Sequence, residues 1–411
     1  MTAFSLRRFG DLATINPKTT LVKGQEYPFV AMEDVAPGYR YVQAPKHRKL
    51  TGGAKFEPGD TLLARITPCL QNGKIAQYDP EGRPGFGSTE FIVLRANPGV
   101  ADPGFIYYLA TSETVREPAV LSMAGASGRQ RADANVVGET LVPAPQLDIQ
   151  RQIVRVLGAY DDLIEVNQRR IAVLEEMTRG LFTEWFIHLR FPGYENVVIE
   201  ETLEGRLPQG WSWGTARDLV LFDPRTSIPR EGEKPFIPMG LLDTSTSLIA
   251  GTEFRSGNSG SKFQNGDTLF ARITPCLENG KTGLVRNLPG PAGTGFGSTE
   301  FIVMRGETVG PAFTYCLSRF PGFREHARQS MSGASGRQRA RSDTVAAYPI
   351  AIPKDRGLFE QFEAAAWSML ELVGQIGQSN ERLAAARDLL LPRLISGQLS
   401  VAQAEKELET T

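Results

Sequence analysis

An internal duplication constrains the fold of this chain more than any other feature. The sequence GDTLLARITPCLQNGK at residues 59–74 recurs as GDTLFARITPCLENGK at 266–281, with 14 of 16 positions identical. Two further blocks recur downstream: GFGSTEFIVLR (85–95) as GFGSTEFIVMR (295–305), and SMAGASGRQRA (122–132) as SMSGASGRQRA (330–340). Solenoid repeats are only a few tens of residues long, so a first offset of 207 residues indicates two tandem copies of a whole domain.

The two copies differ strongly in one segment. Residues 33–54 and 240–261 lie at the constant offset of 207 but share only Arg48/Arg255 and Gly53/Gly260. One scaffold therefore carries two different inserts.

The composition is that of a globular protein. With 41% hydrophobic and 22% charged residues in 45.0 kDa, each copy has enough apolar side chains for its own core. No apolar run approaches the roughly 20 residues that span a bilayer, and the N-terminus lacks the layout of a signal peptide. Three cysteines in 411 residues make neither a disulfide framework nor a zinc pattern. We expect a cytoplasmic protein.

Charge is distributed unevenly along the chain. Residues 1–145 and 196–352 each carry two more basic than acidic residues, whereas 146–195 and 353–411 are acidic by two and by three. Excesses of this size permit a nucleic-acid surface in the two diverged domains but do not require one.

Heptad patterns predict a long helix after each domain. The first seam consists of Leu157, Tyr160, Ile164, Ile171, Leu174, Leu181 and Trp185. The second contains Phe362, Met369, Ile376, Leu383 and Leu390, each seven residues apart. Asn167 interrupts the first seam and Asn380 the second, as register-fixing polar residues do in coiled coils. We expect the helices to pack against each other; the alternative is that each packs only on its own domain.

Within each domain the signals indicate a mostly β fold with a few helices. TLLARI, which begins at Thr61, and the runs FIVLR and FIVMR are typical of short buried strands. Residues 105–121 are predicted to be helical. The small residues at 124–128 cannot continue that helix and predict a loop.

This loop ends in arginines that recur in the second copy. Arg129, Gln130 and Arg131 in the first loop return as Arg337, Gln338 and Arg339. A loop of small residues, with Ser127 and Ser335 at its centre, can bring backbone N–H groups close to phosphate oxygens while arginines donate from both sides. A tight turn with solvated arginines explains the pattern equally well. Arg65, Lys74, Arg272 and Lys281 are open to the same two interpretations, as cations that bind a nucleic-acid backbone or as the polar rim of a hairpin.

The repeated ARITPC, GSTEF and SGASGRQR blocks, together with the DLLLPRLISGQL ending, resemble the DNA-specificity subunit of type I restriction-modification systems. The resemblance covers nearly the whole chain and implies an α+β fold. It implies target recognition domains at 1–145 and 191–352, long helices at 146–190 and 353–400 that pair as an antiparallel coiled coil, and a tail at 401–411. In that family the two domains recognise the halves of a bipartite, asymmetric DNA target, and the helices form a spacer on which partners dock.

The resemblance also implies that the chain brings no chemistry of its own. S-adenosylmethionine would bind to modification (methyltransferase) subunits, two per complex, and ATP to motor-nuclease restriction subunits. The sequence agrees, since it contains no GxxxxGK[ST] phosphate loop and its three histidines lack metal-ligand spacing. Candidate DNA-binding residues are Arg65, Lys74, Ser127, Arg129, Gln130, Arg131, Arg272, Lys281, Ser335, Arg337, Gln338 and Arg339. The competing interpretation is a non-catalytic scaffold whose two variable domains bind two different proteins.

Overall fold

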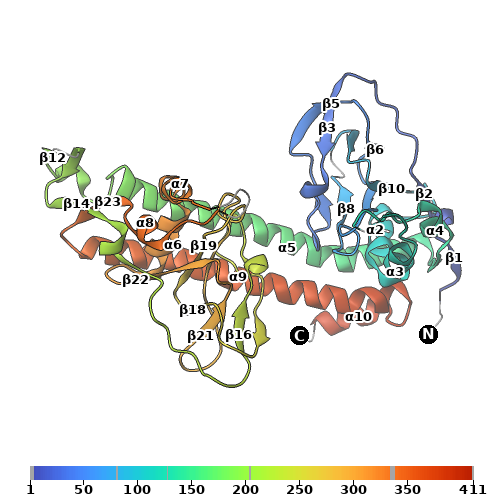
Figure 1. Ribbon diagram of the computed structural model, residues 1–411. Coiled ribbons are helices and arrows are strands. Elements are labelled where there is room, and N and C mark those ends of the chain that lie inside the picture. The colour runs from blue at the N-terminus through green and yellow to red at the C-terminus, as the bar shows by residue number, and fades with distance from the viewer. Residues whose placement is uncertain (1–3, 80–81, 127, 203–204, 334–337, 410–411) are drawn as a thin grey trace. The chain divides into compact units, whose positions relative to one another are not determined.

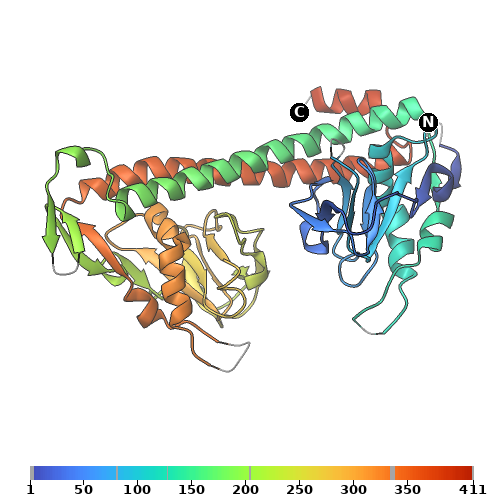
Figure 2. The ribbon, with the colours of Figure 1, turned by 90° about the horizontal axis from the view of Figure 1, so that it is seen from above.

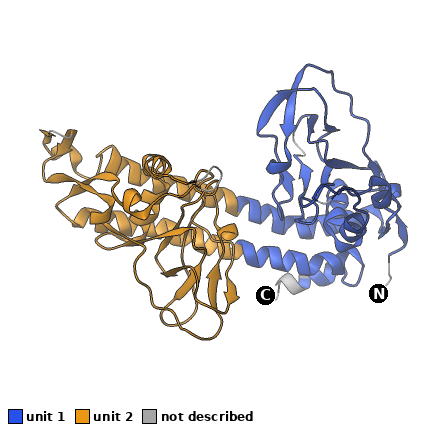
Figure 3. Cartoon of the chain, in the orientation of Figure 1, with its two compact units in different colours: residues 1–166, 380–411 blue, residues 167–379 orange. Residues whose placement is uncertain are grey.

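A computed structural model describes residues 4–79, 82–126, 128–202, 205–333 and 338–409 (Figures 1 and 2). The chain divides into two compact units (Figure 3). Unit 1 comprises residues 1–166 and 380–411, and unit 2 comprises residues 167–379. Both units combine sheets and helices, which confirms the α+β fold class.

The main sheet of unit 1 contains the two strands expected from TLLARI and FIVLR. Its members, in spatial order, are β2 (Ala13–Ile15), β10 (Phe91–Ala96), β7 (Thr61–Ala64), β8 (Ile75–Tyr78) and β4 (Tyr41–Val42). β10 pairs antiparallel with both β2 and β7, whereas β4 runs parallel to β8. All of β7 is buried because successive side chains point to opposite covered faces: Leu63 joins a core with the helices, and Leu62 joins a second core.

A second sheet in unit 1 lies over that second core. Its strands, in spatial order, are β5 (Lys46–Lys49), β3 (Glu26–Val30), β9 (Gly85–Gly87) and β6 (Ala54–Phe56). β3 and β9 are parallel, with Phe29 opposite Phe86, and the outer pairs are antiparallel. Phe56, Tyr78 and Phe91 are buried in the core that this sheet covers.

Unit 2 repeats this arrangement with one strand fewer in its main sheet. The main sheet has the order β15 (Val220–Phe222), β22 (Phe301–Gly306), β19 (Thr268–Ala271), β20 (Thr282–Leu284). The second sheet has the order β17 (Glu253–Arg255), β16 (Lys234–Ile237), β21 (Thr294–Gly297), β18 (Ser261–Gln264). The parallel pair recurs with Phe236 opposite Phe296. The repeated sequence blocks therefore build the same pair of sheets twice.

The helix expected at 105–121 is two helices, α2 (Pro103–Thr111) and α3 (Glu113–Leu121). Ser112 separates them in an extended conformation (ψ 151°), and its hydroxyl donates to the carbonyl of Leu109 at 2.6 Å. Serine often competes with helical backbone bonds in this way. Unit 2 has the same break between α6 (Pro311–Arg319) and α7 (Pro321–Gln329), where the residue before Pro321 is driven out of the helical region.

Shorter elements complete the two units. In unit 1 they are β1 (Leu6–Arg8), α1 (Phe9–Leu12), η1 (Met32–Asp34), α4 (Ala134–Glu139) and β11 (Leu141–Pro143). In unit 2 they are η3 (Tyr194–Asn196), β12 (Ile199–Thr202), β13 (Gly205–Pro208), β14 (Trp211–Thr215), η4 (Ala216–Asp218), η5 (Met239–Leu241), α8 (Ser342–Ala346) and β23 (Pro349–Pro353). β1 pairs with β11, and β14 pairs with β23, so the two ends of each domain meet.

Two long helices carry the expected seams. α5 (Leu147–Phe182) continues into a π-helical turn, η2 (Thr183–Ile187), and α9 (Gly357–Ile395) is followed by α10 (Val401–Glu409) in the expected tail. None of the seam residues is exposed. The division between the units crosses the helices at Asn167 and Asn380, the two expected register residues.

Within each unit, parts of α5 and α9 pack side by side in opposite directions (Figures 1 and 2). In unit 1, Leu157 shares a core with Leu394, and Asp161 pairs with Arg387. In unit 2, the ring of Phe182 in α5 contacts that of Phe362 in α9. The ring of Phe186 in η2 stacks on that of Phe359, also in α9. These contacts confirm helix-against-helix packing.

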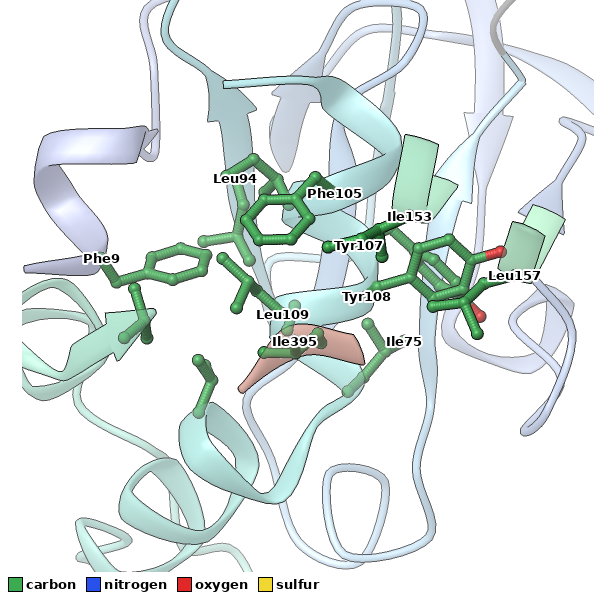
Figure 4. Packing of buried hydrophobic residues seen from close by; sticks show 14 of the residues in the cluster. Phe9, Ile75, Leu94, Phe105, Tyr107, Tyr108, Leu109, Ile153, Leu157 and Ile395 are labelled. Atoms are coloured by element: carbon green, nitrogen blue, oxygen red, sulfur yellow. The ribbon is translucent and has the colours of Figure 1, made fainter. Parts of the chain in front are cut away.

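The core of unit 1 joins the helices to the main sheet. Phe105 and Leu109 of α2 pack with Leu94 of β10, Ile153 of α5 and Ile395 of α9 (Figure 4). Both long helices therefore form part of the core of this domain rather than only a spacer. In the part of the chain that the structure describes, no helix is long and apolar enough to cross a membrane.

The two identities between the divergent inserts have structural causes. Arg48 lies over the ring of Phe29, 4.1 Å from its centroid, and Arg255 lies 4.0 Å from that of Phe236, so each covers an aromatic residue of the parallel strand pair. The second shared residue is a glycine with positive φ, 118° at Gly53 and 127° at Gly260. Both shared residues therefore lie where the inserts attach to the common sheet.

Gly53→Ala is expected to destabilise unit 1 by about 2 kcal/mol or more, because it combines positive-φ strain with overpacking. A Cβ atom at this position would lie 2.1 Å from the backbone oxygen of Gly87 in the adjacent strand. Urea unfolding measures the change. Gly52→Ala is the matched control, since a Cβ there meets nothing within 4 Å. Equal stability of the two variants would contradict this explanation of the shared glycine.

Candidate nucleic-acid interface

The three repeated blocks meet at one place in each unit. We call this place the three-block cluster and define it as residues 65–67, 88–90 and 129–132 in unit 1. Its backbone is tied together because the N–H of Arg65 donates to the carbonyl of Glu90 at 2.9 Å and that of Ala132 to Arg65 at 2.8 Å.

Unit 2 contains the equivalent cluster at residues 272–274, 298–300 and 338–340. The N–H of Arg272 donates to the carbonyl of Glu300 at 3.0 Å, and that of Ala340 donates to Arg272 at 2.8 Å. Blocks far apart in sequence thus recur together because they build one local structure.

The arginine loop is fastened to this cluster through the described residues at its ends. Arg131 forms an antiparallel bridge with Ala124 across the loop and a second one with Ile66, and Arg339 bridges to Ser332 and Ile273 in unit 2. The carbonyl of Gln130 accepts a bond from the N–H of Thr67 at 3.0 Å, as that of Gln338 does from Thr274 at 3.1 Å. The described residues at both ends of each loop are therefore held in place, and the role of the loop arginines stays a prediction.

The second arginine of each loop is paired within its own domain. The Arg131 guanidinium holds both carboxylate oxygens of Glu90, with Nη2 to Oε1 at 2.6 Å and Nε to Oε2 at 2.8 Å. Arg339 holds Glu300 in the same way, at 2.6 and 2.8 Å. These hydrogen bonds lower the pKa of both carboxyl groups, so each pair stays ionised at neutral pH.

The first arginine differs. Arg129 is exposed and forms no ion pair with any described residue, so an incoming anion can reach its guanidinium without displacing a carboxylate. Its equivalent Arg337 lies outside the described residues, as do Ser127 and Ser335.

The remaining candidates contact their own domains. The Lys74 ammonium donates to the carbonyl of Met32 at 2.8 Å, and Lys281 donates to Met239 at 3.0 Å, so each lysine ties its hairpin to the short turn η1 or η5. Arg65 is half-buried, with Nη2 donating to the carbonyl of Ala132 at 3.2 Å. Arg272 is half-buried at the equivalent position. DNA contacts by these four residues remain a prediction.

Sequence reasoning missed Glu90 and Glu300, the partners of the loop arginines. Both glutamates lie in the repeated GSTEF block. A carboxylate and an arginine that recur together in both copies could have indicated that the two side chains pair. Within the described ranges, no group of three or more histidine, cysteine, aspartate or glutamate side chains is placed to hold a metal ion.

Comparisons with known proteins agree with this architecture. Residues 2–176 match the family model described as the type I restriction modification DNA specificity domain. The type I restriction enzyme MjaIX specificity subunit of Methanocaldococcus jannaschii is 23% identical over 97% of this chain and 93% of its own length. The EcoEI specificity subunit of Escherichia coli is 29% identical over 38% of this chain and 27% of its own length.

A solved structure shares the fold. The S subunit of a type I restriction-modification system from M. genitalium aligns over 95% of this chain and 96% of its own, at 14% identity and a TM-score of 0.53. The family model matches the first copy, and the second copy repeats its blocks and its sheets. The chain is therefore similar over nearly its whole length to DNA-specificity subunits of type I restriction-modification systems.

Proposed function

We propose that this chain is a non-catalytic, sequence-specific DNA-binding subunit that recognises a bipartite, asymmetric target. The observation that carries the proposal is the presence of one three-block cluster in each unit beside inserts that differ in sequence. Contacts to the DNA backbone position a protein, whereas contacts to base edges specify the sequence. The common clusters suit the first task, and residues 33–54 and 240–261 suit the second.

The proposal assigns the chemistry to other subunits. Two modification subunits would transfer methyl groups from S-adenosylmethionine, motor-nuclease restriction subunits would use ATP, and this chain would direct both to the target. The long helices support a docking role because they expose large apolar side chains outside their seams, including Leu163, Val173 and Met177 on α5 and Leu372 and Leu389 on α9.

We expect the two halves of the target to differ in sequence. Selection of bound sequences from a random duplex library with the full chain should return two unlike half-sites separated by a gap of fixed length. The reason is that two inserts with two identities in 22 positions cannot present the same donors and acceptors to bases. A palindromic target would refute the asymmetry, and no enrichment at all would refute the function.

A chain in which residues 33–54 replace 240–261 is the matched control. Both inserts have the same length and attach to the same second sheet through Arg48/Arg255 and Gly53/Gly260. Selection with this variant should return the first half-site twice. An unchanged target would show that the bases are read elsewhere in the domains.

A further inference from the structure

Each unit contains a pocket next to its three-block cluster. In unit 1 a cavity of about 660 Å³ is lined by Lys55 of β6, Arg65 after β7 and Thr89 before β10. In unit 2 a cavity of about 310 Å³ is lined by Lys262, Arg272 and Thr299. Arg65 and Thr89 also belong to the cluster, so pocket and cluster form one continuous surface.

The two pockets are built from the same positions of the repeat. Each of the nine residues that line the unit 2 pocket has a counterpart lining the unit 1 pocket, and seven of the nine are identical. Lys55 directly follows the divergent insert at 33–54, which has two identities with its counterpart. The chain therefore keeps most of this surface the same directly beside the segment in which its two copies differ most.

The lining suits a phosphate group. Lys55 and Lys262 form no ion pair with any described residue, and each shares its pocket with an arginine and an exposed threonine. Of the five N–H donors of the Arg65 guanidinium, one is engaged by the carbonyl of Ala132, and Nε is buried without a partner in the described structure. Lysine and arginine together with a hydroxyl donor are typical ligands of phosphate oxygens.

One acidic residue lines the unit 2 pocket, and its carboxylate is already occupied. Asp223 accepts a hydrogen bond from the backbone N–H of Val303 at 2.9 Å through Oδ1 and another from the hydroxyl of Ser342 through Oδ2. Its counterpart Asn16 accepts the equivalent bond from Val93 at 3.0 Å. This position therefore holds the strand β10 or β22 in both units, and the lysine and arginine remain for a ligand.

We propose that each pocket binds a backbone phosphate of duplex DNA. The inference rests on the proposed function and adds the subsite. Two domains that read different bases share only the sugar-phosphate backbone as a common ligand, so a pocket with the same lysine, arginine and threonine in both should bind that backbone. Lys55 and Lys262 are the residues it adds to those expected from the sequence.

Salt-dependent binding of random-sequence duplex DNA to the full chain tests this assignment. A phosphate contact contributes about 0.9 to the slope of log affinity against log salt concentration. Lys55→Gln and Lys262→Gln should each flatten the slope by about that amount, and the double variant by about 1.8. Lys55→Arg keeps the charge and should keep the slope, whereas a merely structural lysine would not be rescued in this way.

Lys23→Gln and Lys354→Gln are the controls, because both lysines are exposed and lie outside the two pockets. Titration with inorganic phosphate separates the two sources of the ligand. Loss of inorganic phosphate binding in Lys55→Gln and Lys262→Gln with an unchanged DNA salt slope would assign the pockets to a free anion and overturn the proposal. An unchanged slope without phosphate binding would overturn it too. Failure of the wild-type chain to bind duplex DNA would instead refute the proposed function itself.

Discussion

Asp161→Ala is expected to destabilise unit 1 by about 3 to 5 kcal/mol, because it leaves the buried guanidinium of Arg387 with only the exposed carboxylate of Asp388 as a counter-ion. The Asp161 carboxylate of α5 receives Nη1 of Arg387 from α9 at 2.5 Å and the phenol of Tyr108 from α2 at 2.5 Å. The carboxylate is 3% exposed and the guanidinium side chain 9%. Burial and the neighbouring carboxylate raise the pKa of Tyr108, so its phenol stays protonated and continues to donate.

Urea unfolding of matched variants isolates this effect. Asp162→Ala removes an exposed carboxylate one position further along the same helix and should change the free energy of unfolding by less than about 0.5 kcal/mol. An apolar pair, Asp161→Leu with Arg387→Met, should recover part of the loss, because neither charge of the pair is then buried alone while the phenol of Tyr108 still lacks its acceptor. Similar unfolding midpoints for Asp161→Ala and Asp162→Ala would show that the buried pair does not hold the helices and the domain together.

Unit 2 is attached to α5 by a second buried carboxylate. Glu175 accepts the backbone N–H of Ser247 at 2.5 Å and the phenol of Tyr315 at 2.7 Å. Asp161 and Glu175 each directly follow a seam residue and are two heptads apart. Thus α5 presents one buried carboxylate to a tyrosine of each domain.

Sequence periodicity predicted the helices but not these attachments. The seam could be read from apolar residues at heptad spacing, and its residues are buried or half-buried in the structure. From the sequence alone the carboxylate of Asp161, beside the seam, would be expected to be solvated. Its partners Tyr108 and Arg387 lie 53 and 226 residues away along the chain. Periodicity also did not show that α2 and α3 are separate, because the break depends on the extended backbone at Ser112 and not on the apolar pattern.

Only part of the candidate site could be predicted from the sequence, because here too the partners of some side chains lie far away along the chain. Repetition marked the loop arginines and the blocks at Arg65 and Arg272, and the structure brings these blocks together. Pairing decides which side chains are available: Arg131 faces a glutamate 41 residues earlier in the chain, whereas Arg129 is exposed without an ion pair to a described residue. Lys55 and Lys262 lie outside the three repeated blocks, so the sequence did not mark them as binding residues. Their equivalent positions in the two pockets are visible only in the structure.

Lengthening both long helices by one heptad is expected to widen the gap in the target without changing its half-sites. α5 runs from unit 1 into unit 2, and the division between the units crosses it after Val166 and crosses α9 after Ser379. Seven residues inserted at each of these points keep the seams in phase and add roughly 10 Å of helix. At about 3.4 Å per base pair this corresponds to a gap about three base pairs longer.

Sequences selected from a random duplex library measure the gap directly. Five residues inserted at the same points would turn the seam by roughly 140° and should abolish specific binding, because the apolar residues would no longer face each other. Seven residues inserted after Gly210, in the turn before β14 where a Cβ meets nothing within 4 Å, lengthen the chain outside the helices, the inserts and the pockets and should leave the gap unchanged. The seven-residue helix variant must bind both half-sites for the measurement to count. If it does so with the original gap, the helices do not set the spacing.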